Sequence, residues 1–227
     1  LSRELVRRLV FIAPGSVDLV AVLRWEWLAQ LHALSFKAPR HAFSQLRSDR
    51  LAMLLGTRQL RGLRELELDS QHLGDEGAAA LAASDAFPSL QAFTLSNDRL
   101  SSVGLEPLSQ AGWFTRLEKL VLVHHDLGPD AAHVLAATRF KKLRSLVLSS
   151  NRIGDEGAVV LARGQHFSKL EALWLTSNRL GVAGVEALLG SKTLAKTQLF
   201  LESNQLGDKV MERVSVRNAA LTRPAGR

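Results

Sequence analysis

The chain has 227 residues, 46% of them hydrophobic, which is enough for a sizeable core in one globular or solenoid domain. It contains no cysteine, so disulfide bonds, thiolate metal sites and a cysteine nucleophile are excluded, and a reducing, cytoplasmic location is expected. The net charge is +7 and arises within residues 1–64, while no apolar run reaches the roughly 18 residues that a membrane span needs. Because the chain begins with Leu1 rather than methionine, we expect a fragment or a processed product whose true N-terminus is missing.

An irregular unit occupies residues 1–30. The alternation of Val6, Leu9 and Phe11 predicts a strand, and the stretch from Pro14 to Ser16 predicts a turn. Residues 17–28 then have the pattern of a helix. We assign this unit to a degenerate first repeat, or to the start of the array that follows.

One pattern recurs six times further along the chain. Each copy is a short alternating strand, a loop and a helix. A weaker copy precedes them, with a strand at Leu31, Leu34 and Phe36 and a helix over residues 49–55. The six clear copies start 26 or 27 residues apart, at Leu63, Leu90, Leu117, Leu143, Leu170 and Lys196. This period predicts a stacked array, which we place at residues 31–211.

The remaining residues, 212–227, lose the pattern. We expect the end of the last helix there, followed by a basic, disordered tail. No unit that would cap either end of the array is visible, which leaves self-association through the exposed terminal repeats open.

The copy at residues 143–162, LRSLVLSSNRIGDEGAVVLA, shows the unit most clearly. Its leucines alternate as in a strand with one buried face, Gly154 breaks the chain, and Asp155 is expected to cap the helix that follows. Three further aspartates occupy similar places and are predicted to cap their own helices. They are Asp75, Asp130 and Asp208. Glycines in the first helical turn, among them Gly104 and Gly184, are expected to let each helix approach the sheet.

The pattern L-x-x-L-x-L-x-x-N-x-L, followed by G-D-E-G-A, resembles the leucine-rich repeat, and specifically its ribonuclease-inhibitor-like class. The resemblance implies an α/β solenoid of about eight repeats, a curved horseshoe with parallel strands on the concave face and helices on the convex face. In that family the asparagine bonds backbone groups along the turn. Here it is present in three of the clear repeats and replaced in three: Asn151, Asn178 and Asn204 keep it, and Gln71, Asp98 and His125 replace it.

Two apolar columns are predicted to form the core. One lies three positions before the first residue of each repeat, and the other lies on the helices. The first column contains Leu60, Phe87, Phe114, Phe140 and Phe167, and the second contains Leu54, Leu81, Leu108, Leu135, Leu161 and Leu188.

Catalytic signatures are absent from the sequence. There is no G-x-S-x-G, P-loop or H-E-x-x-H motif. The only dense cluster is His124, His125 and Asp126, and His125 occupies the asparagine position, where a loop hydrogen bond explains it. We therefore predict a protein without catalytic residues, metal or cofactor.

The column between the second and third leucines should face the concave surface. Its second half is apolar, with Val121, Val147, Trp174 and Phe200 on adjacent strands, and such a stripe is typical of a protein interface. We predict that it binds a partner protein whose identity the sequence does not name. Flanking residues complete the predicted site: Val123, Thr176 and Glu202 beside the stripe, and Glu65, Glu67 and Asp69 as an acidic patch that selects a basic surface.

Two alternatives stay open at this stage. One is an activator of small GTPases, which rests on analogy with relatives of this repeat class alone. The other is a basic N-terminal patch that binds nucleic acid or anionic lipid, although we rank nucleic acid below protein as a partner. The patch would contain Arg3, Arg7, Arg8, Arg24, Arg40, Arg47 and Arg50.

Overall fold

The computed structural model describes residues 7–12, 18–38 and 46–222. Eight strands form one parallel sheet in which every strand pairs with its neighbours in sequence order, from β1 to β8. The strands are β1 Arg8–Ile12, β2 Ala33–Lys37, β3 Glu65–Asp69, β4 Ala92–Ser96, β5 Lys119–Val123, β6 Ser145–Val147, β7 Ala172–Trp174 and β8 Gln198–Phe200.

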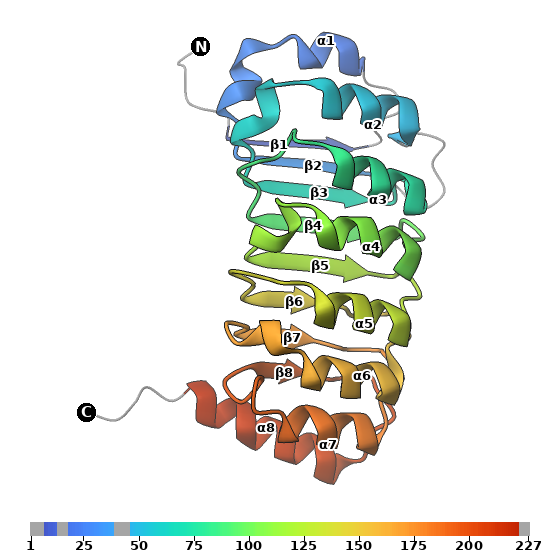
Figure 1. The fold of residues 1–227 in the computed structure, drawn as a ribbon, viewed down its shortest axis with the longest axis vertical. Coiled ribbons are helices and arrows are strands. Elements are labelled where there is room, and N and C mark those ends of the chain that lie inside the picture. Colours follow the sequence, from blue (N-terminus) through green and yellow to red (C-terminus); the bar gives the residue numbers. More distant parts are fainter. Residues whose placement is uncertain (1–6, 13–17, 39–45, 223–227) are drawn as a thin grey trace, which may run out of the picture.

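A helix follows each strand and returns the chain to the start of the next one. The helices lie side by side along one face of the sheet and leave the other face open (Figure 1). We call the open face concave, because strands stack about 4.8 Å apart whereas packed helices need about 8–10 Å. The α-helices are α1 Leu19–Leu23, α2 Arg47–Gly56, α3 Gly74–Ala83, α4 Ser102–Gln110, α5 Pro129–Ala137, α6 Gly154–Arg163, α7 Val182–Gly190 and α8 Asp208–Thr222.

The two predicted core columns are confirmed. The column before the strands is buried from Leu60 to Phe167, and the helix column is completely buried throughout. Phe114, Phe140 and Phe167 form a continuous row, with ring centroids 5.8 and 6.2 Å apart. Three members of the column before the strands lie in short 3-10 turns: Leu60 in η3 Gln59–Gly62, Phe114 in η4 Phe114–Arg116 and Phe167 in η5 Gln165–Phe167.

The first repeat differs from its prediction. In place of one helix over residues 17–28, the chain forms the short α1 and then a 3-10 turn, η2 Glu26–Gln30. Trp25 between them has an extended backbone, with φ −72° and ψ 115°. The break lets η2 bury Leu28, which lies three positions before Leu31 and so occupies the core column of the other repeats. The predicted turn from Pro14 to Ser16 lies outside the described residues.

For Asp75 and Asp155 the predicted capping of a helix start is confirmed, but the helix that each one caps belongs to the next repeat. Asp155 does not cap α6; its Oδ1 accepts hydrogen bonds from the backbone N–H groups of Gly181 (2.7 Å) and Gly184 (2.9 Å), at the start of α7. Asp75 likewise bonds Ser101 at the start of α4, through the backbone N–H (2.7 Å) and the hydroxyl (2.6 Å). These carboxylates therefore join one repeat to the next.

This arrangement also explains the first-turn glycines differently. A Cβ on Gly184 would lie 2.5 Å from Oδ1 of Asp155, and one on Gly104 would lie 2.4 Å from Oδ1 of Asp75. Glycine is required there because the aspartate of the preceding repeat approaches the helix backbone, rather than because the helix approaches the sheet.

Helix α8 covers the outer edge of β8. The Asn218 side chain accepts a hydrogen bond from the Leu199 N–H (3.0 Å) and donates one to the Leu199 carbonyl (2.7 Å). The expectation that no unit caps the C-terminal end is therefore wrong for this edge of the sheet. The predicted boundary between residues 211 and 212 falls inside α8, and the division of the chain at residue 30 stays a prediction.

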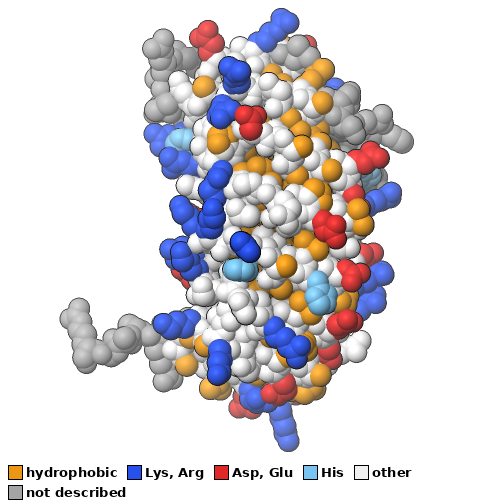
Figure 2. All heavy atoms as spheres, in the orientation of Figure 1, with side chains coloured by type: hydrophobic (Ala, Val, Ile, Leu, Met, Phe, Trp, Pro, Cys, Tyr) orange, Lys and Arg blue, Asp and Glu red, His pale blue; other side chains and the backbone are white. Residues whose placement is uncertain are grey.

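The two edges of the solenoid carry opposite charges. We define the amino edge as the six segments that join helices α2 to α7 to the strands that follow them: residues 57–64, 84–91, 111–118, 138–144, 164–171 and 191–197. In Figure 2 lysines and arginines gather along one flank and carboxylates along the opposite flank. The amino edge holds eleven cations against three carboxylates: Arg58, Arg61, Arg64, Arg116, Arg139, Lys141, Lys142, Arg144, Lys169, Lys192 and Lys196 against Asp85, Glu118 and Glu171.

The carboxyl edge comprises the loops after the strands together with the first turns of the helices. From the end of β3 to the first turn of α8, four cations face nine carboxylates there. The cations are Arg99, Arg152, Arg179 and Lys209, and the carboxylates are Asp75, Glu76, Asp98, Asp126, Asp130, Asp155, Glu156, Glu202 and Asp208.

Candidate functional site

The predicted concave column lies in register across all eight strands. Each member pairs with the equivalent residue of the next strand, so their side chains form one line on the open face. The line runs Val10, Ser35, Glu67, Thr94, Val121, Val147, Trp174 and Phe200.

The apolar half of this column forms a continuous stripe. Val121, Val147, Trp174 and Phe200 are each half-buried, in contrast to the leucines on the other side of the same strands, which are fully buried. The rings of Trp174 and Phe200 stack, with centroids 4.5 Å apart and an interplanar angle of 7°. Stacking holds the two aromatic side chains in one orientation, which lowers the entropy cost of using them as a binding surface.

The neighbouring row contains the other residues predicted beside the stripe. Val123 pairs in register with Ser96 and is half-buried. Thr176 donates a hydrogen bond from its hydroxyl to Oε2 of Glu202 (3.1 Å), which places these two side chains together at the carboxyl ends of β7 and β8.

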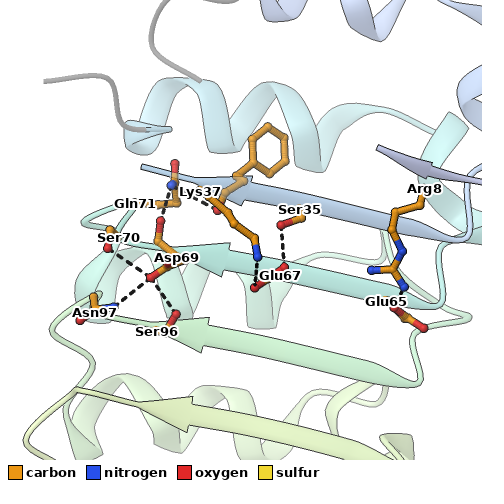
Figure 3. A network of polar contacts seen from close by, with 11 residues as sticks. Arg8, Ser35, Lys37, Glu65, Glu67, Asp69, Ser70, Gln71, Ser96 and Asn97 are labelled. Atoms are coloured by element: carbon orange, nitrogen blue, oxygen red, sulfur yellow. Dashed lines mark hydrogen bonds and ion pairs between the residues drawn. The ribbon is translucent and has the colours of Figure 1, made fainter. Parts of the chain in front are cut away.

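The three carboxylates of β3 are engaged within the protein (Figure 3). Glu65 forms an ion pair with Arg8 (2.6 Å), and Glu67 pairs with Lys37 (3.0 Å). Glu67 also accepts a hydrogen bond from the Ser35 hydroxyl (2.7 Å).

Asp69 has no cation within the network. Its Oδ1 accepts hydrogen bonds from the hydroxyls of Ser70 (3.2 Å) and Ser96 (2.9 Å) and from Nδ2 of Asn97 (2.9 Å). The acidic patch is thus a set of side chains held by donors from β1, from both strands beside β3 and from the loops after β3 and β4. Sequence reasoning missed these donors, although aligning the repeats would have placed Lys37 and Ser35 on the strand beside Glu67.

The asparagine position joins each repeat to the preceding one, whichever residue occupies it. In all six repeats a side-chain atom accepts the N–H of the residue that lies 24 or 25 positions earlier. The pairs are Gln71 with Leu46, Asp98 with Leu73, His125 with Leu100, Asn151 with Leu127, Asn178 with Ile153, and Asn204 with Leu180.

The same side chains also donate to a carbonyl of the preceding strand segment, with one exception. Gln71, His125, Asn151, Asn178 and Asn204 each reach the third leucine position of the previous repeat. Asp98 makes no such bond, and its buried Oδ2 atom has no partner. Burial, partly offset by backbone hydrogen bonds, raises the pKa of Asp98 from 3.8 to about 7.

His125 fills its place as a neutral ring. Its Nε2 lies 2.8 Å from the Leu95 carbonyl and its Nδ1 accepts the Leu100 N–H (3.3 Å), so we assign the proton to Nε2. Burial lowers the pKa of His125 from 6.5 to about 4. Its neighbour Asp126 pairs with Arg152 (2.9 Å), so the cluster seen in the sequence divides between two different contacts.

A shallow hollow of about 760 Å³ lies over this cluster at the carboxyl edge. Within the described parts of the chain, no three His, Asp or Glu side chains gather closely enough to hold a metal ion. No helix in those parts is long and apolar enough to cross a membrane.

The arginines of the alternative N-terminal patch have different surroundings. Arg8 is occupied by Glu65, Arg50 is half-buried, and Arg7 and Arg24 are exposed. The other predicted members lie outside the described residues, namely Arg3, Arg40 and the side chain of Arg47.

Comparisons with known proteins agree with this architecture. A family model described as "Leucine Rich repeat" matches residues 60–82, 141–162 and 168–189. The comparison with curated proteins finds no match. Among solved structures, the crystal structure of a TLR13-ssRNA13 complex is similar with a TM-score of 0.50 and 18% identity, covering 90% of this chain and 30% of that one.

The chain therefore spans less than a third of the length of the solved protein that it resembles, and the likeness concerns the fold. The parallel sheet, the helix after each strand and the matching repeats define an α/β leucine-rich-repeat solenoid.

Proposed function

We propose that this protein is a non-catalytic scaffold that binds a partner protein through the concave face. Val121, Val147, Trp174 and Phe200 would be the anchors. The observation that carries the proposal is the in-register apolar stripe, which ends in the stacked pair of Trp174 and Phe200.

The chemistry of the stripe favours a protein as the ligand. Aromatic residues dominate the energetics of protein interfaces when they lie near the centre of the contact and a polar rim surrounds them. A stable interface buries about 800 Å² on each partner, which several strands and their loops can supply. Repeat solenoids commonly present such extended surfaces to other proteins.

The polar members of the predicted site would orient the partner. Thr176 and Glu202 lie beside the aromatic end, and Val123 extends the apolar area. Glu65, Glu67 and Asp69 already have internal partners, so a basic partner surface would have to share or replace those contacts. We therefore expect them to contribute less affinity than the stripe.

The experiment compares two double variants in pull-downs, followed by calorimetry with the recovered partner. Trp174→Ala combined with Phe200→Ala should reduce affinity by at least 100-fold, since each anchor contributes about 2 kcal/mol or more. Val103→Ala combined with Val182→Ala is the matched control, because both valines are exposed on the helix side, at 68% and 52%. Circular dichroism confirms that both variants are folded, and undiminished binding by the first variant would sink the concave-anchor proposal.

We extend the proposal to the repeat class and to the location. A helix in every clear repeat and a period of 26 or 27 residues support the ribonuclease-inhibitor-like class. The absence of cysteine supports a cytoplasmic protein, which fractionation of cells expressing the full reading frame would test. No contact in the described residues favours GTPase activation, so we do not propose it.

A further inference from the structure

The amino edge is a cationic surface that the concave-face function does not use. All eleven of its lysines and arginines are exposed, and they come from five of the six helix-to-strand segments. Equivalent positions of successive repeats lie side by side, so these charges form one row along the flank rather than scattered points. Within the described part of the chain, only Arg61 and Arg144 of this row pair with carboxylates, which are Asp85 and Glu171.

Three of the unpaired cations converge on one hollow. A depression of about 490 Å³ on this edge is lined by Arg64, Arg116 and Lys142, which belong to three different repeats, and Glu118 is its single carboxylate. Arg116 is held in place by a hydrogen bond to the Pro88 carbonyl (3.3 Å). A site with three cations and one carboxylate favours an anion, such as a phosphate group.

An exposed tryptophan lies at the N-terminal end of the same flank. Trp25 precedes η2, the segment that also contributes Ala29 to the hollow, and 44% of its surface is exposed. It stacks on Trp27, with ring centroids 5.4 Å apart. Tryptophan beside lysine and arginine is the composition of surfaces that lie at the boundary between water and lipid headgroups.

A nucleic acid would need a series of exposed rings along this row of charges, and Trp25 supplies one only at its N-terminal end. Proteins that bind single strands place aromatic rings along the cationic groove so that successive bases stack on them. The aromatic residues within the row are Phe87, Trp113, Phe114, Phe140 and Phe167, and all five are buried in the core. The row thus offers phosphate contacts without a stacking platform.

Helix dipoles account for part of the charge pattern. The helices run parallel, their C-termini lie at the amino edge, and cations are stabilised there. That effect is local to each helix end. It explains neither the convergence of three repeats on one hollow nor the exposed Trp25.

We propose that the amino edge docks onto a membrane surface that carries anionic lipids. Arg64, Arg116 and Lys142 contact headgroup phosphates, and Trp25 enters the headgroup region. This interaction is peripheral, and it leaves the concave face free for a protein partner.

The test is cosedimentation with vesicles of phosphatidylcholine containing about one third phosphatidylserine, against vesicles of phosphatidylcholine alone. The protein should bind the anionic vesicles, and binding should fall as salt is raised. Arg64→Gln combined with Lys142→Gln should weaken binding about 30-fold, because each cation near an anionic surface contributes about fivefold. Quenching of Trp25 by brominated lipid should disappear in Trp25→Leu.

Arg99→Gln combined with Arg179→Gln is the matched control. It removes the same charge from the opposite edge and should leave vesicle binding unchanged. Equal loss in both double variants would show that net charge alone acts, which overturns the proposal. The proposal would also be overturned by equal binding to both kinds of vesicle or by binding to neither. A third contradicting result is tighter binding to a single-stranded oligonucleotide, if the double variant at Arg64 and Lys142 abolishes that binding.

Discussion

The first three clear repeats and the last three use different side chains at the asparagine position, which joins each repeat to the preceding one. Asn151, Asn178 and Asn204 each combine an acceptor and a donor in one amide, and every one of them bonds the preceding repeat in both ways. Gln71 and His125 reproduce both bonds, whereas Asp98 reproduces only the acceptor. The comparison shows that an acceptor is present at this position in every clear repeat, and that the donor is missing at Asp98 alone.

The largest effect should come from the half that keeps asparagine. Oδ1 of Asn151 accepts the N–H groups of His125 (3.0 Å) and Leu127 (3.1 Å). Asn151→Leu preserves the side-chain volume but leaves both buried donors without an acceptor, so the free energy of unfolding should fall by about 5 kcal/mol. Urea denaturation followed by circular dichroism measures it.

Gln71→Leu serves as the control from the other half. Within the described residues the Gln71 side chain accepts one backbone N–H, that of Leu46 (3.0 Å), so the loss should be about half as large. Equal losses in the two variants would contradict the idea that the number of accepted N–H groups sets the stability of each junction.

The next effect should come from restoring the missing donor. In the unfolded chain the pKa of Asp98 is near 3.8, and in the folded protein it is about 7. The folded state therefore holds a proton that the unfolded state releases, and stability falls as pH rises from about 4 to 7. The difference between the two pKa values of Asp98 lowers the free energy of unfolding at pH 8 by at most about 4 kcal/mol relative to a pH at which Asp98 is protonated in both states.

Asp98→Asn supplies an N–H₂ group where Oδ2 has no partner. It should stabilise the protein by a few kcal/mol at pH 8 and by much less at pH 4, where Asp98 is already protonated. Unfolding midpoints in urea at pH 4, 6 and 8 measure the change. A gain that is the same at all three values would mean that ionisation of Asp98 has no part in it.

Much of this comparison could be read from the sequence, because the repeat period sets the alignment. The period of 26 or 27 residues placed Gln71, Asp98 and His125 at the asparagine position, and it placed Val121, Val147, Trp174 and Phe200 in one column. Side-chain period and stacking are local rules that the sequence displays directly.

The contacts between repeats could not be read in the same way. Capping rules apply along one helix and therefore assign Asp155 to α6, whereas the N–H groups that it accepts belong to Gly181 and Gly184 at the start of α7. Charge sums over residues 65–227 are balanced, because each repeat crosses both edges and a sum along the chain averages them. The two edges become visible only when the cations are sorted by their place within the repeat.

The smallest of the three effects concerns His125, and it has the opposite sign to that of Asp98. The pKa of His125 is 6.5 in the unfolded chain and about 4 in the folded protein. Between these two pH values the unfolded state therefore binds a proton at His125 and the folded state does not. Its contribution is complete above pH 6.5 and is lost as pH falls toward 4, by at most about 3 kcal/mol. His125→Asn should remove this loss, because an amide keeps both the acceptor and the donor without titrating.

Between pH 4 and 6.5 the two residues therefore oppose each other. Acidification protonates the unfolded state at His125, which destabilises the fold, and it removes the cost of ionised Asp98, which stabilises the fold. The unchanged protein should show nearly constant stability across this range, Asp98→Asn should become less stable toward acid, and His125→Asn should become more stable toward acid. Urea titrations of both single variants and the double variant test it. If the free energy of unfolding of the double variant changes more with pH than that of the unsubstituted protein, groups other than Asp98 and His125 govern the response to pH.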